Sequence, residues 1–279
     1  MIARFAGAAL ALSLATTAAA QDRVIAAGGS VTEIVYALGQ QDRLIARDTT
    51  SVFPHEVTAL PDVGYLRALS PEGVLAQAPD LVITEADAGP PATMEVLRAA
   101  GVPVVTLEEA FSAEGIAAKI TAVGAALNRQ DAAAALAGQI SADMAQAQTL
   151  AQDVAPEDQS KVLFILTLQD GKIMAAGQDT GADAMIALAG GQNAAQGFSG
   201  YKLMSDEAVI QAAPEVILMM DRARGHALDD AALFALPALS GSPAAETGAV
   251  IRMNGLYLLG FGPRTAQAIG ELSQALYDR

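Results

Sequence analysis

Residue types that often build ligand sites are absent or scarce in this chain. Its 279 residues include no cysteine, no tryptophan and only two histidines, His55 and His226. Without cysteine the chain forms no disulfide, and export with a lipid on a processed cysteine is excluded. A zinc or manganese carrier gathers several histidines and carboxylates, so two scattered histidines argue against that class. Without indole, no pocket stacks its ligand on tryptophan.

Basic residues are also few. The chain has 16 Lys and Arg against 31 Asp and Glu, which gives a formal net charge of -15. A strongly acidic surface repels phosphate backbones and anionic membranes, so nucleic acid is not an expected partner. The sequence contains neither the G-x-S-x-G nor the H-E-x-x-H pattern, so we expect a binding protein and not an enzyme.

No apolar run reaches the roughly 20 residues that a membrane-spanning helix needs. The apolar stretch at 5–15 follows Arg4 and precedes small residues at 17–20. A positive start, a short apolar stretch and a small-residue cleavage site are typical of a signal peptide. We therefore expect residues 1–20 to be removed on export to the periplasm. Because Arg4 is lost and no acid is, the formal charge of the soluble remainder becomes -16.

What the sequence does contain is an internal repeat. Residues 70–83 and 205–218 share one pattern at a constant offset of 135 residues. In each copy a serine precedes a short amphipathic helix with a glutamate in its first turn, Glu72 or Glu207, and an apolar strand follows. The repeat predicts one α/β lobe built twice, with a ligand cleft between the two lobes.

Strand and helix patterns alternate along the chain. Strands are expected at 23–27, 43–46, 81–84, 104–107, 161–168, 216–220 and 256–260. Helices are expected at 32–38, 71–77, 94–100, 182–189 and after residue 264. Such alternation favours Rossmann-like parallel sheets covered on both faces. The glycine turn at 28–30 lacks the G-x-G-x-x-G spacing and a following P-loop lysine, which argues against a dinucleotide site.

Residues 131–153 contain no proline and one glycine, which predicts one long helix. It lies between the two copies of the repeat, so we expect it to connect the lobes, although an ordinary surface helix of the first lobe is the alternative. The predicted organisation is then a signal peptide at 1–20, an N-terminal α/β lobe at 21–130, the connecting helix at 131–153 and a C-terminal α/β lobe at 154–279.

Several segments resemble a known family. Besides the signal segment, they are GGSVTE at 28–33, DVGYLR at 62–67, AAGQ at 175–178, GFSGYK at 197–202 and LLGFGPR at 258–264. The chain resembles the periplasmic haem-binding proteins of bacterial haem ABC importers over essentially its whole mature length. The resemblance implies an α/β fold with two Rossmann-like lobes joined by a single long helix, and the GYLR stretch favours haem over other ligands.

In that family a tyrosine is the axial ligand of ferric haem, and the resemblance gives this role to Tyr65. A phenolate is a hard anionic oxygen donor that suits Fe(III). Free tyrosine loses its proton only near pH 10, so iron and the nearby cation Arg67 are expected to stabilise the phenolate. Spacing alone favours an ordinary packing tyrosine and a solvated arginine, and the resemblance is what favours haem ligation. Tyr201 and Lys202 are expected at the mouth of the site.

Some family members add a histidine ligand after the first strand of the second lobe. This chain has Leu168 there, which implies iron held by Tyr65 alone or a sixth ligand from elsewhere, with His226 as a candidate. The haem propionates need cationic partners, and the guanidinium groups of Arg222 and Arg224 match carboxylates. A solvated loop is the alternative for these two arginines.

Glu72 and Glu207 occupy equivalent positions in the two repeats. A carboxylate in the first turn of a helix interacts favourably with the helix dipole, which alone explains both residues. In the wider family, one glutamate on each lobe docks against arginines of the membrane permease. The resemblance therefore implies that Glu72 and Glu207 are docking residues.

The sequence thus predicts a soluble, monomeric periplasmic binding protein that captures ferric haem for iron acquisition. It would deliver the haem to an inner-membrane ABC permease with its ATPase. A siderophore or cobalamin binder of the same fold is the alternative, because fold, export signal and docking acids would be shared. Tyr65 separates these readings, since a siderophore site need not involve it.

Overall fold

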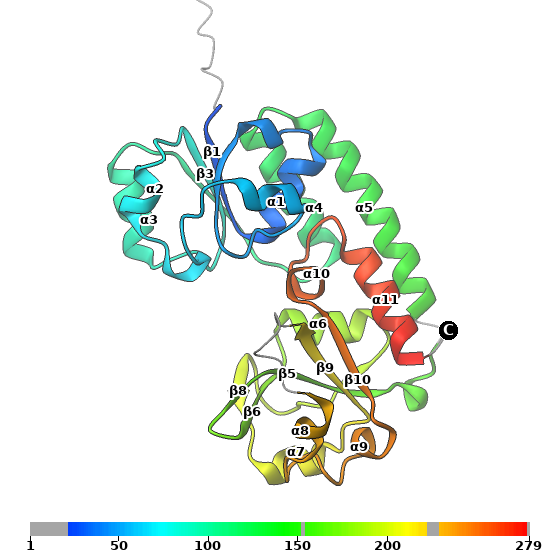
Figure 1. Ribbon diagram of the computed structural model, residues 1–279. Helices are drawn as coiled ribbons and strands as arrows, with labels where there is room; N and C mark the ends of the chain where they lie inside the picture. The colour runs from blue at the N-terminus through cyan, green and yellow to red at the C-terminus, as the bar shows by residue number, and fades with distance from the viewer. Residues whose placement is uncertain (1–21, 152–153, 222–228, 278–279) are drawn as a thin grey trace, which may run out of the picture.

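The computed structural model describes residues 22–151, 154–221 and 229–277. The predicted signal peptide at 1–20 lies outside these residues. Two α/β lobes lie one above the other, and long helices run along one side of the pair (Figure 1). No helix in the described part of the chain combines the length and the apolar character needed to cross a bilayer.

The first lobe is built on a four-stranded parallel sheet with the strand order β2-β1-β3-β4. Its strands are β1 Val24–Ala27, β2 Leu44–Arg47, β3 Leu81–Glu85 and β4 Val104–Leu107. All four residues of β1 are fully buried, because a central strand of a parallel sheet is covered on both faces. The four strands predicted for this lobe are confirmed.

Helices cover both faces of this sheet. They are α1 Gly29–Ala37, α2 Pro71–Leu75, α3 Pro91–Ala99 and α4 Ala113–Ala126. Val24 and Ala26 of β1 pack with α1 and α4, whereas Ile25 and Ala27 pack with α2 and α3. This division follows from the alternation of side chains along a strand. Helix α4, which begins after the capping residue Ser112, was not predicted from the sequence.

The second lobe has a six-stranded mixed sheet with the order β10-β9-β5-β6-β8 and β7 beside β5. The strands are β5 Lys161–Gln169, β6 Lys172–Ala176, β7 Gln192–Asn193, β8 Tyr201–Leu203, β9 Val216–Asp221 and β10 Val250–Asn254. The strands β10, β9, β5 and β7 pair in parallel, as the alternation favoured, whereas β6 pairs antiparallel with both β5 and β8. Asp170 and Gly171, with φ of 51° and 77°, turn β5 directly back into β6.

The helices of the second lobe are short. They are α6 Gly181–Leu188, α7 Asp206–Ala212, α8 Asp230–Phe234, α9 Pro243–Thr247 and α10 Gly255–Leu259, and α11 Thr265–Tyr277 closes the chain. The strand predicted at 256–260 is wrong, because this segment is α10. Asn254 caps that helix by accepting a hydrogen bond from the Tyr257 amide at 3.0 Å. Short apolar runs do not distinguish a strand from a buried helix by periodicity alone.

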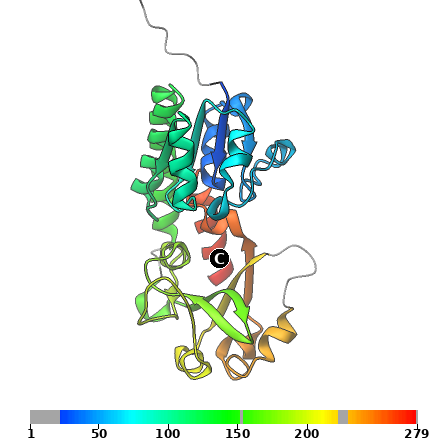
Figure 2. The ribbon, with the colours of Figure 1, turned by 90° about the vertical axis from the view of Figure 1, so that its left-hand side faces the viewer.

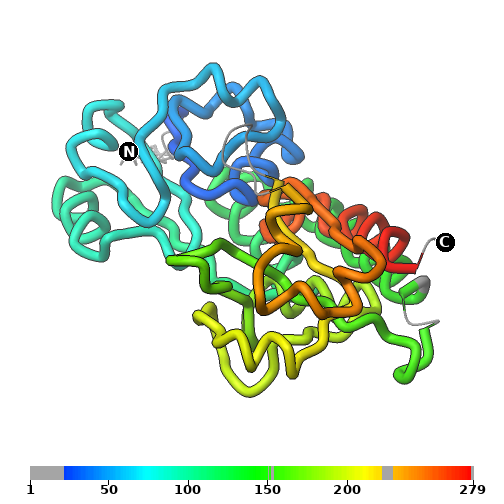
Figure 3. The backbone as a smooth tube through the Cα atoms, turned by 60° about the horizontal axis from the view of Figure 1, so that its bottom comes forward, coloured from blue at the N-terminus to red at the C-terminus, as the bar shows by residue number. Residues whose placement is uncertain are grey.

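The predicted connecting helix is confirmed as α5 Gln130–Ala151, which runs from the first lobe to the second and packs against α4 and α11. The structure adds a second passage between the lobes. After β10 the chain returns through α10 to the first lobe (Figure 3). There the ring centroids of Phe261 and Phe111 lie 5.0 Å apart. The division at 21–130, 131–153 and 154–279 stays a prediction.

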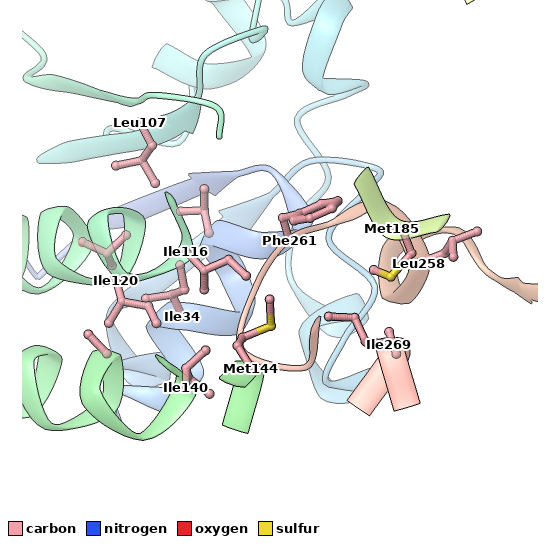
Figure 4. Close-up of a cluster of buried hydrophobic side chains, with 14 of the residues drawn as sticks. Ile34, Leu107, Ile116, Ile120, Ile140, Met144, Met185, Leu258, Phe261 and Ile269 are labelled. Carbon is pink, nitrogen blue, oxygen red and sulfur yellow. The ribbon is translucent and has the colours of Figure 1, made fainter. Parts of the chain in front are cut away.

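The two lobes share one hydrophobic core. A continuous cluster of buried side chains extends from the first lobe along α4 and α5 to α10 and α11, and includes Ile34, Ile116, Met144, Phe261 and Ile269 (Figure 4). Helix α11 runs beside α5 along one side of the molecule and lies behind the junction of the lobes in the orthogonal view (Figure 2). The predicted fold class, two α/β lobes with a long connecting helix, is therefore confirmed.

Candidate ligand-binding site between the lobes

A cavity of about 680 Å³ opens between the lobes, within the size range of small-molecule sites. Its walls come from the first lobe, the second lobe and the returning segment around α10. The lining residues are Gly29, Thr49, Thr50, Val52, Tyr65, Leu66, Arg67, Glu85, Leu166, Tyr201, Met220, Asn254, Gly255, Leu256, Leu259 and Gly260. The walls combine apolar side chains with a few polar groups, as is typical of a specific ligand pocket.

Tyr65 stands at this cavity on an irregular segment of the first lobe. Gly64, with φ of 102°, turns the chain just before it, and Leu66, which is 2% exposed, anchors the chain just after it. The Asp62 carboxylate accepts a hydrogen bond from the Gly64 amide at 2.8 Å and fixes the turn. The backbone is thus held while the Tyr65 side chain is 44% exposed toward solvent and the cavity.

Arg67 holds the Tyr65 phenol from one side. Its Nη1 donates a hydrogen bond to the phenol oxygen at 2.7 Å, and its Nη2 pairs with the Asp87 carboxylate. Burial acts to lower the pKa of Arg67, but the bond to Tyr65 and the charge of Asp87 outweigh it, so the pKa is raised. A charged guanidinium therefore faces the phenol oxygen and donates a hydrogen bond to it.

Two carboxylates of the first lobe, the half-buried Glu85 in the cavity lining and Asp48 beside the lining residue Thr50, were missed by the sequence analysis. Glu85 ends β3 and accepts a hydrogen bond from Ser30 at 2.6 Å, and burial raises its pKa. Asp48 is fully buried and accepts hydrogen bonds from the Gly28 amide and from the hydroxyls of Thr50 and Ser51. The position of Glu85 at the carboxyl end of a parallel strand was the available signal, because such ends face ligand sites.

The glycine turn after β1 serves close packing. A Cβ atom on Gly29 would lie 2.2 Å from a methyl carbon of Leu256 on α10. Gly28 has φ of 124°, and a Cβ atom there would lie 2.6 Å from the side chain of Glu85. The turn thus allows the returning segment and the floor of the cavity to approach the start of α1.

The second lobe contributes Leu166, Tyr201 and Met220 to the cavity wall. Leu168, the position at which the sequence analysis considered a second iron ligand, packs on the core of the second lobe. Tyr201 was expected at the mouth and lines the cavity, whereas Lys202 lines a separate groove of about 600 Å³ on the second lobe.

Three residues considered in the sequence analysis, Arg222, Arg224 and His226, lie outside the described residues. His55 lies in the 3-10 helix His55–Ala59 and does not line the cavity. In the part of the chain that the structure describes, no group of three or more His, Asp or Glu side chains is arranged to hold a metal ion. Of the site residues expected from the sequence, Tyr65 and Arg67 form a hydrogen-bonded pair at the cavity mouth.

Glu72 and Glu207 have the same local environment on α2 and α7. Ser70 and Ser205 cap the two helices, each accepting a backbone hydrogen bond at 3.2 Å. Backbone hydrogen bonding and then the capping serine hydroxyl hold the pKa of each glutamate below its usual value. Both side chains are exposed and ionised at neutral pH, so each lobe presents an anion at the start of its repeated helix.

The two-lobed fold and the cavity between the lobes define a ligand-binding protein. The family model described as periplasmic binding protein matches residues 24–255, which span both lobes and most of the cavity. The chain belongs to this family of binding proteins.

Two solved structures of periplasmic haem-binding proteins are similar to this chain. BhuT, solved in complex with two haems, is 40% identical, covers 92% of this chain and 98% of its own, and superposes with a TM-score of 0.86. RhuT from Roseiflexus sp. RS-1, solved in apo form, is 37% identical with the same coverage and a TM-score of 0.88. The vitamin B12-binding protein of Vibrio campbellii is 27% identical over 226 residues, 79% of this chain and 78% of that protein.

Proposed function

We propose that this protein captures ferric haem in the cavity between its lobes and delivers it to the permease of an ABC importer. The observation that carries the proposal is the Tyr65–Arg67 pair, with its 2.7 Å hydrogen bond at the cavity mouth. A phenolate is a hard oxygen donor suited to Fe(III), and tyrosine is an established axial ligand of haem. The similarity to BhuT and RhuT, both titled haem-binding, supports the same ligand.

The cavity walls suit a flat apolar ring. Val52, Leu66, Leu166, Leu256 and Leu259 line the cavity from both lobes and from the returning segment. Burial of a porphyrin face against such side chains contributes about 25 cal/mol for each Å² of apolar surface removed from water. Iron coordination by Tyr65 then selects for a ferric centre within an otherwise apolar ligand.

Cationic groups for the two propionates are proposed from the sequence. Arg222 and Arg224 follow β9, which ends at Asp221. The carboxyl ends of parallel strands face the ligand site in open α/β sheets. Guanidinium groups bind carboxylates with two parallel hydrogen bonds, so these arginines are proposed partners of the propionates.

Delivery is proposed to use Glu72 and Glu207. The two carboxylates project from equivalent helix starts on the two lobes and are exposed. A pair of like anions related by an internal repeat matches a two-fold permease that presents arginines to each lobe. A periplasmic location, a removed signal peptide and a monomeric state complete the proposal.

The test is a titration of the purified protein, lacking residues 1–20, with hemin, followed by absorption spectroscopy of wild type and Tyr65→Ala at equal loading. We expect a saturable complex with a high-spin tyrosinate spectrum, which the variant loses. Tyr65 is exposed, so the variant should fold, and thermal unfolding checks this. Absence of saturable binding would overturn the proposal, and an unchanged variant spectrum would overturn the role of Tyr65.

Cobalamin is the second candidate, because vitamin B12-binding proteins are among the relatives of this chain. A parallel titration with cyanocobalamin distinguishes the two ligands. Saturable binding of cobalamin without binding of hemin, unaffected by Tyr65→Ala, would establish this second function in place of the first. A parallel titration with a ferric siderophore in place of cyanocobalamin tests the siderophore alternative.

A further inference from the structure

The internal repeat extends further toward the N-terminus than the serines that cap α2 and α7. A Gly-Tyr pair stands before each serine, with Tyr65 five residues before Ser70 and Tyr201 four residues before Ser205. The two copies therefore differ here by one residue. Each lobe thus presents a tyrosine from an equivalent place, just before its repeated helix.

The backbone supports this equivalence. Gly64 and Gly200 both have positive φ, 102° and 77°, a conformation that glycine adopts without a steric penalty. Leu69 and Met204, which stand directly before the capping serines, are both buried, at 2% and 7% exposure. Each lobe thus holds its segment by the same means, a glycine turn at one end and a buried apolar side chain at the other.

Both tyrosines line the same cavity, from opposite lobes. Their exposed fractions are similar, 44% for Tyr65 and 40% for Tyr201. Two phenols related by an internal repeat therefore enclose the space that the proposed haem occupies. An exposed aromatic side chain at the mouth of an apolar cavity is typical of a ligand contact.

Tyr201 is held firmly by its backbone. It begins β8 and pairs with Ala176 of β6, while Gly200 exchanges backbone hydrogen bonds of 2.9 Å with Gly177 and Gln178. Its ring meets Phe164 edge to face, with 6.5 Å between the ring centroids. The phenol oxygen has no hydrogen-bond partner within the described residues, so it is available to a ligand.

The other second-lobe groups at the cavity are poorer donors to ferric iron. Met220 offers a soft thioether, which prefers softer metal ions, and Leu166 offers no donor atom. The side-chain oxygen of Asn254 already accepts a hydrogen bond of 3.0 Å from the Tyr257 amide. Tyr201 therefore carries the one hard oxygen that the described part of the second lobe presents to the cavity without an existing partner.

The two phenols differ in their electrostatic surroundings. Burial raises the pKa of Tyr201, the charge of Arg67 across the cavity opposes this rise, and the charge of Glu109 adds to it. Tyr65 has Arg67 within hydrogen-bond distance, whereas Tyr201 does not. Arg67 thus acts on Tyr65 by direct contact and on Tyr201 only across the cavity.

We propose that Tyr201 is the second-lobe oxygen donor to the ferric iron, facing the haem from the side opposite Tyr65. This inference rests on the proposed haem-binding function. It assigns Tyr65 as the anchor that binds first and Tyr201 as the contact that the second lobe adds. The missing histidine at Leu168 is thereby replaced by a residue from a different strand.

The test uses the protein lacking residues 1–20, loaded with less than one equivalent of hemin, as wild type, Tyr201→Phe and Tyr36→Phe. Tyr36 lies on α1 outside the cavity and serves as the matched control. We expect Tyr201→Phe to remove one of two phenolate signatures from the resonance Raman spectrum. Its affinity for hemin should fall about tenfold, equivalent to about 1.4 kcal/mol, while the control behaves as wild type.

A second variant, Tyr201→His, tests the same position by gain of a ligand. If the side chain faces the iron, an imidazole there should replace the Tyr201 phenolate as the second-lobe donor and change the electron paramagnetic resonance spectrum from that of wild type. Saturable, Tyr65-dependent hemin binding with no spectral change in either Tyr201 variant would overturn this inference and leave the proposed function intact. Absence of saturable hemin binding by wild type would overturn both.

Discussion

The repeated helices α2 and α7 are alike in detail, while the cavity segments before them are not. Ser70 and Ser205 cap them with equal hydrogen-bond lengths of 3.2 Å. Even the strained residues after them correspond, because Ala78 and Ala213 both adopt positive φ, 47° and 45°. The repeat therefore preserves the backbone conformation at both ends of these helices.

The chemistry differs in the segments that precede these helices. In the first lobe Tyr65 is followed by Arg67, which binds its phenol oxygen, whereas Tyr201 is followed by Lys202, whose ammonium lies over the ring of Phe198. Only the first lobe, in the described part of the chain, thus supplies a cation bound directly to its phenol. The comparison shows that the side chains facing the ligand lie on loops. The repeated helices and strands position these loops but do not determine their side chains.

The largest effect is expected when a mutation removes a contact between the returning segment and the first lobe. Arg264 binds both carboxylate oxygens of the buried Glu33 and stacks on Phe53, 3.6 Å from its ring centroid. Arg264→Ala leaves Glu33 without its partner, which should lower the free energy of unfolding by about 3–5 kcal/mol. Denaturant unfolding measures this loss. Arg252→Ala, which breaks an exposed pair with Asp230, is the control and should cost about 0–1 kcal/mol.

The pH dependence of Arg264→Ala sharpens the test. Burial raises the pKa of Glu33, and Arg264 opposes that rise. Without Arg264 the folded pKa rises further above the unfolded value of 4.5, so the folded variant keeps a proton that the unfolded chain releases. The free energy of unfolding of the variant should therefore fall as pH rises above about 4.5. Its deficit relative to wild type should be larger at pH 7 than at pH 4.5. An equal deficit at both pH values would contradict this account.

An intermediate effect is expected when the first lobe loses its distinguishing cation. Arg67→Leu removes the hydrogen bond to the phenol oxygen of Tyr65. Hydrogen bonds to charged groups contribute about 1.5–3 kcal/mol, so hemin affinity should fall about 10-fold to 100-fold. Titration at equal protein concentration measures the change. Arg67→Lys keeps the charge without the planar fork and should fall between wild type and Arg67→Leu, whereas wild-type affinity in both variants would refute the role.

A smaller effect tests whether the two repeats act together at the permease. Glu72→Gln with Glu207→Gln should leave hemin binding unchanged and reduce haem transfer into permease-containing vesicles about tenfold, with each single variant giving part of the loss. Glu114→Gln is the matched control. Glu114 lies in the first turn of α4 after the capping Ser112, and the same contacts lower its pKa. Equal loss of transfer in this control would assign the effect to capping.

The sequence predicted the frame well, because the signals for it are local. Capping serines, first-turn acids and buried apolar strands fall within a few residues of one another, and the strands of the first lobe were located from them. The strand expected at 256–260 failed because its apolar run of four residues fits a buried helix equally well, and the cap at Asn254 decided the outcome. Helix α4 was missed because its alanines and glycines give no clear apolar stripe.

The site was predicted less completely, because its contacts join residues far apart in the chain. The Tyr65–Arg67 contact spans two residues and was expected from the sequence. Glu85 accepts a hydrogen bond from Ser30 across 55 residues, and Asp87 pairs with Arg67 with α2 and β3 between them in the chain, so neither contact was visible as a pattern. The resemblance placed Leu168 near the ligand, but the register of β5 shifts between Ile165 and Thr167, and Leu168 packs on the second-lobe core.

Within the described residues the chain passes between the lobes three times: along α5, from β10 through α10 to the first lobe, and back along α11, where the Tyr277 hydroxyl donates a hydrogen bond to the Gly190 carbonyl. Buried side chains of α5, α10 and α11 belong to one continuous cluster. Two domains are expected to move against each other unless the interface between them is large and apolar. This cluster therefore opposes wide separation of the lobes, because separation would expose its side chains to water.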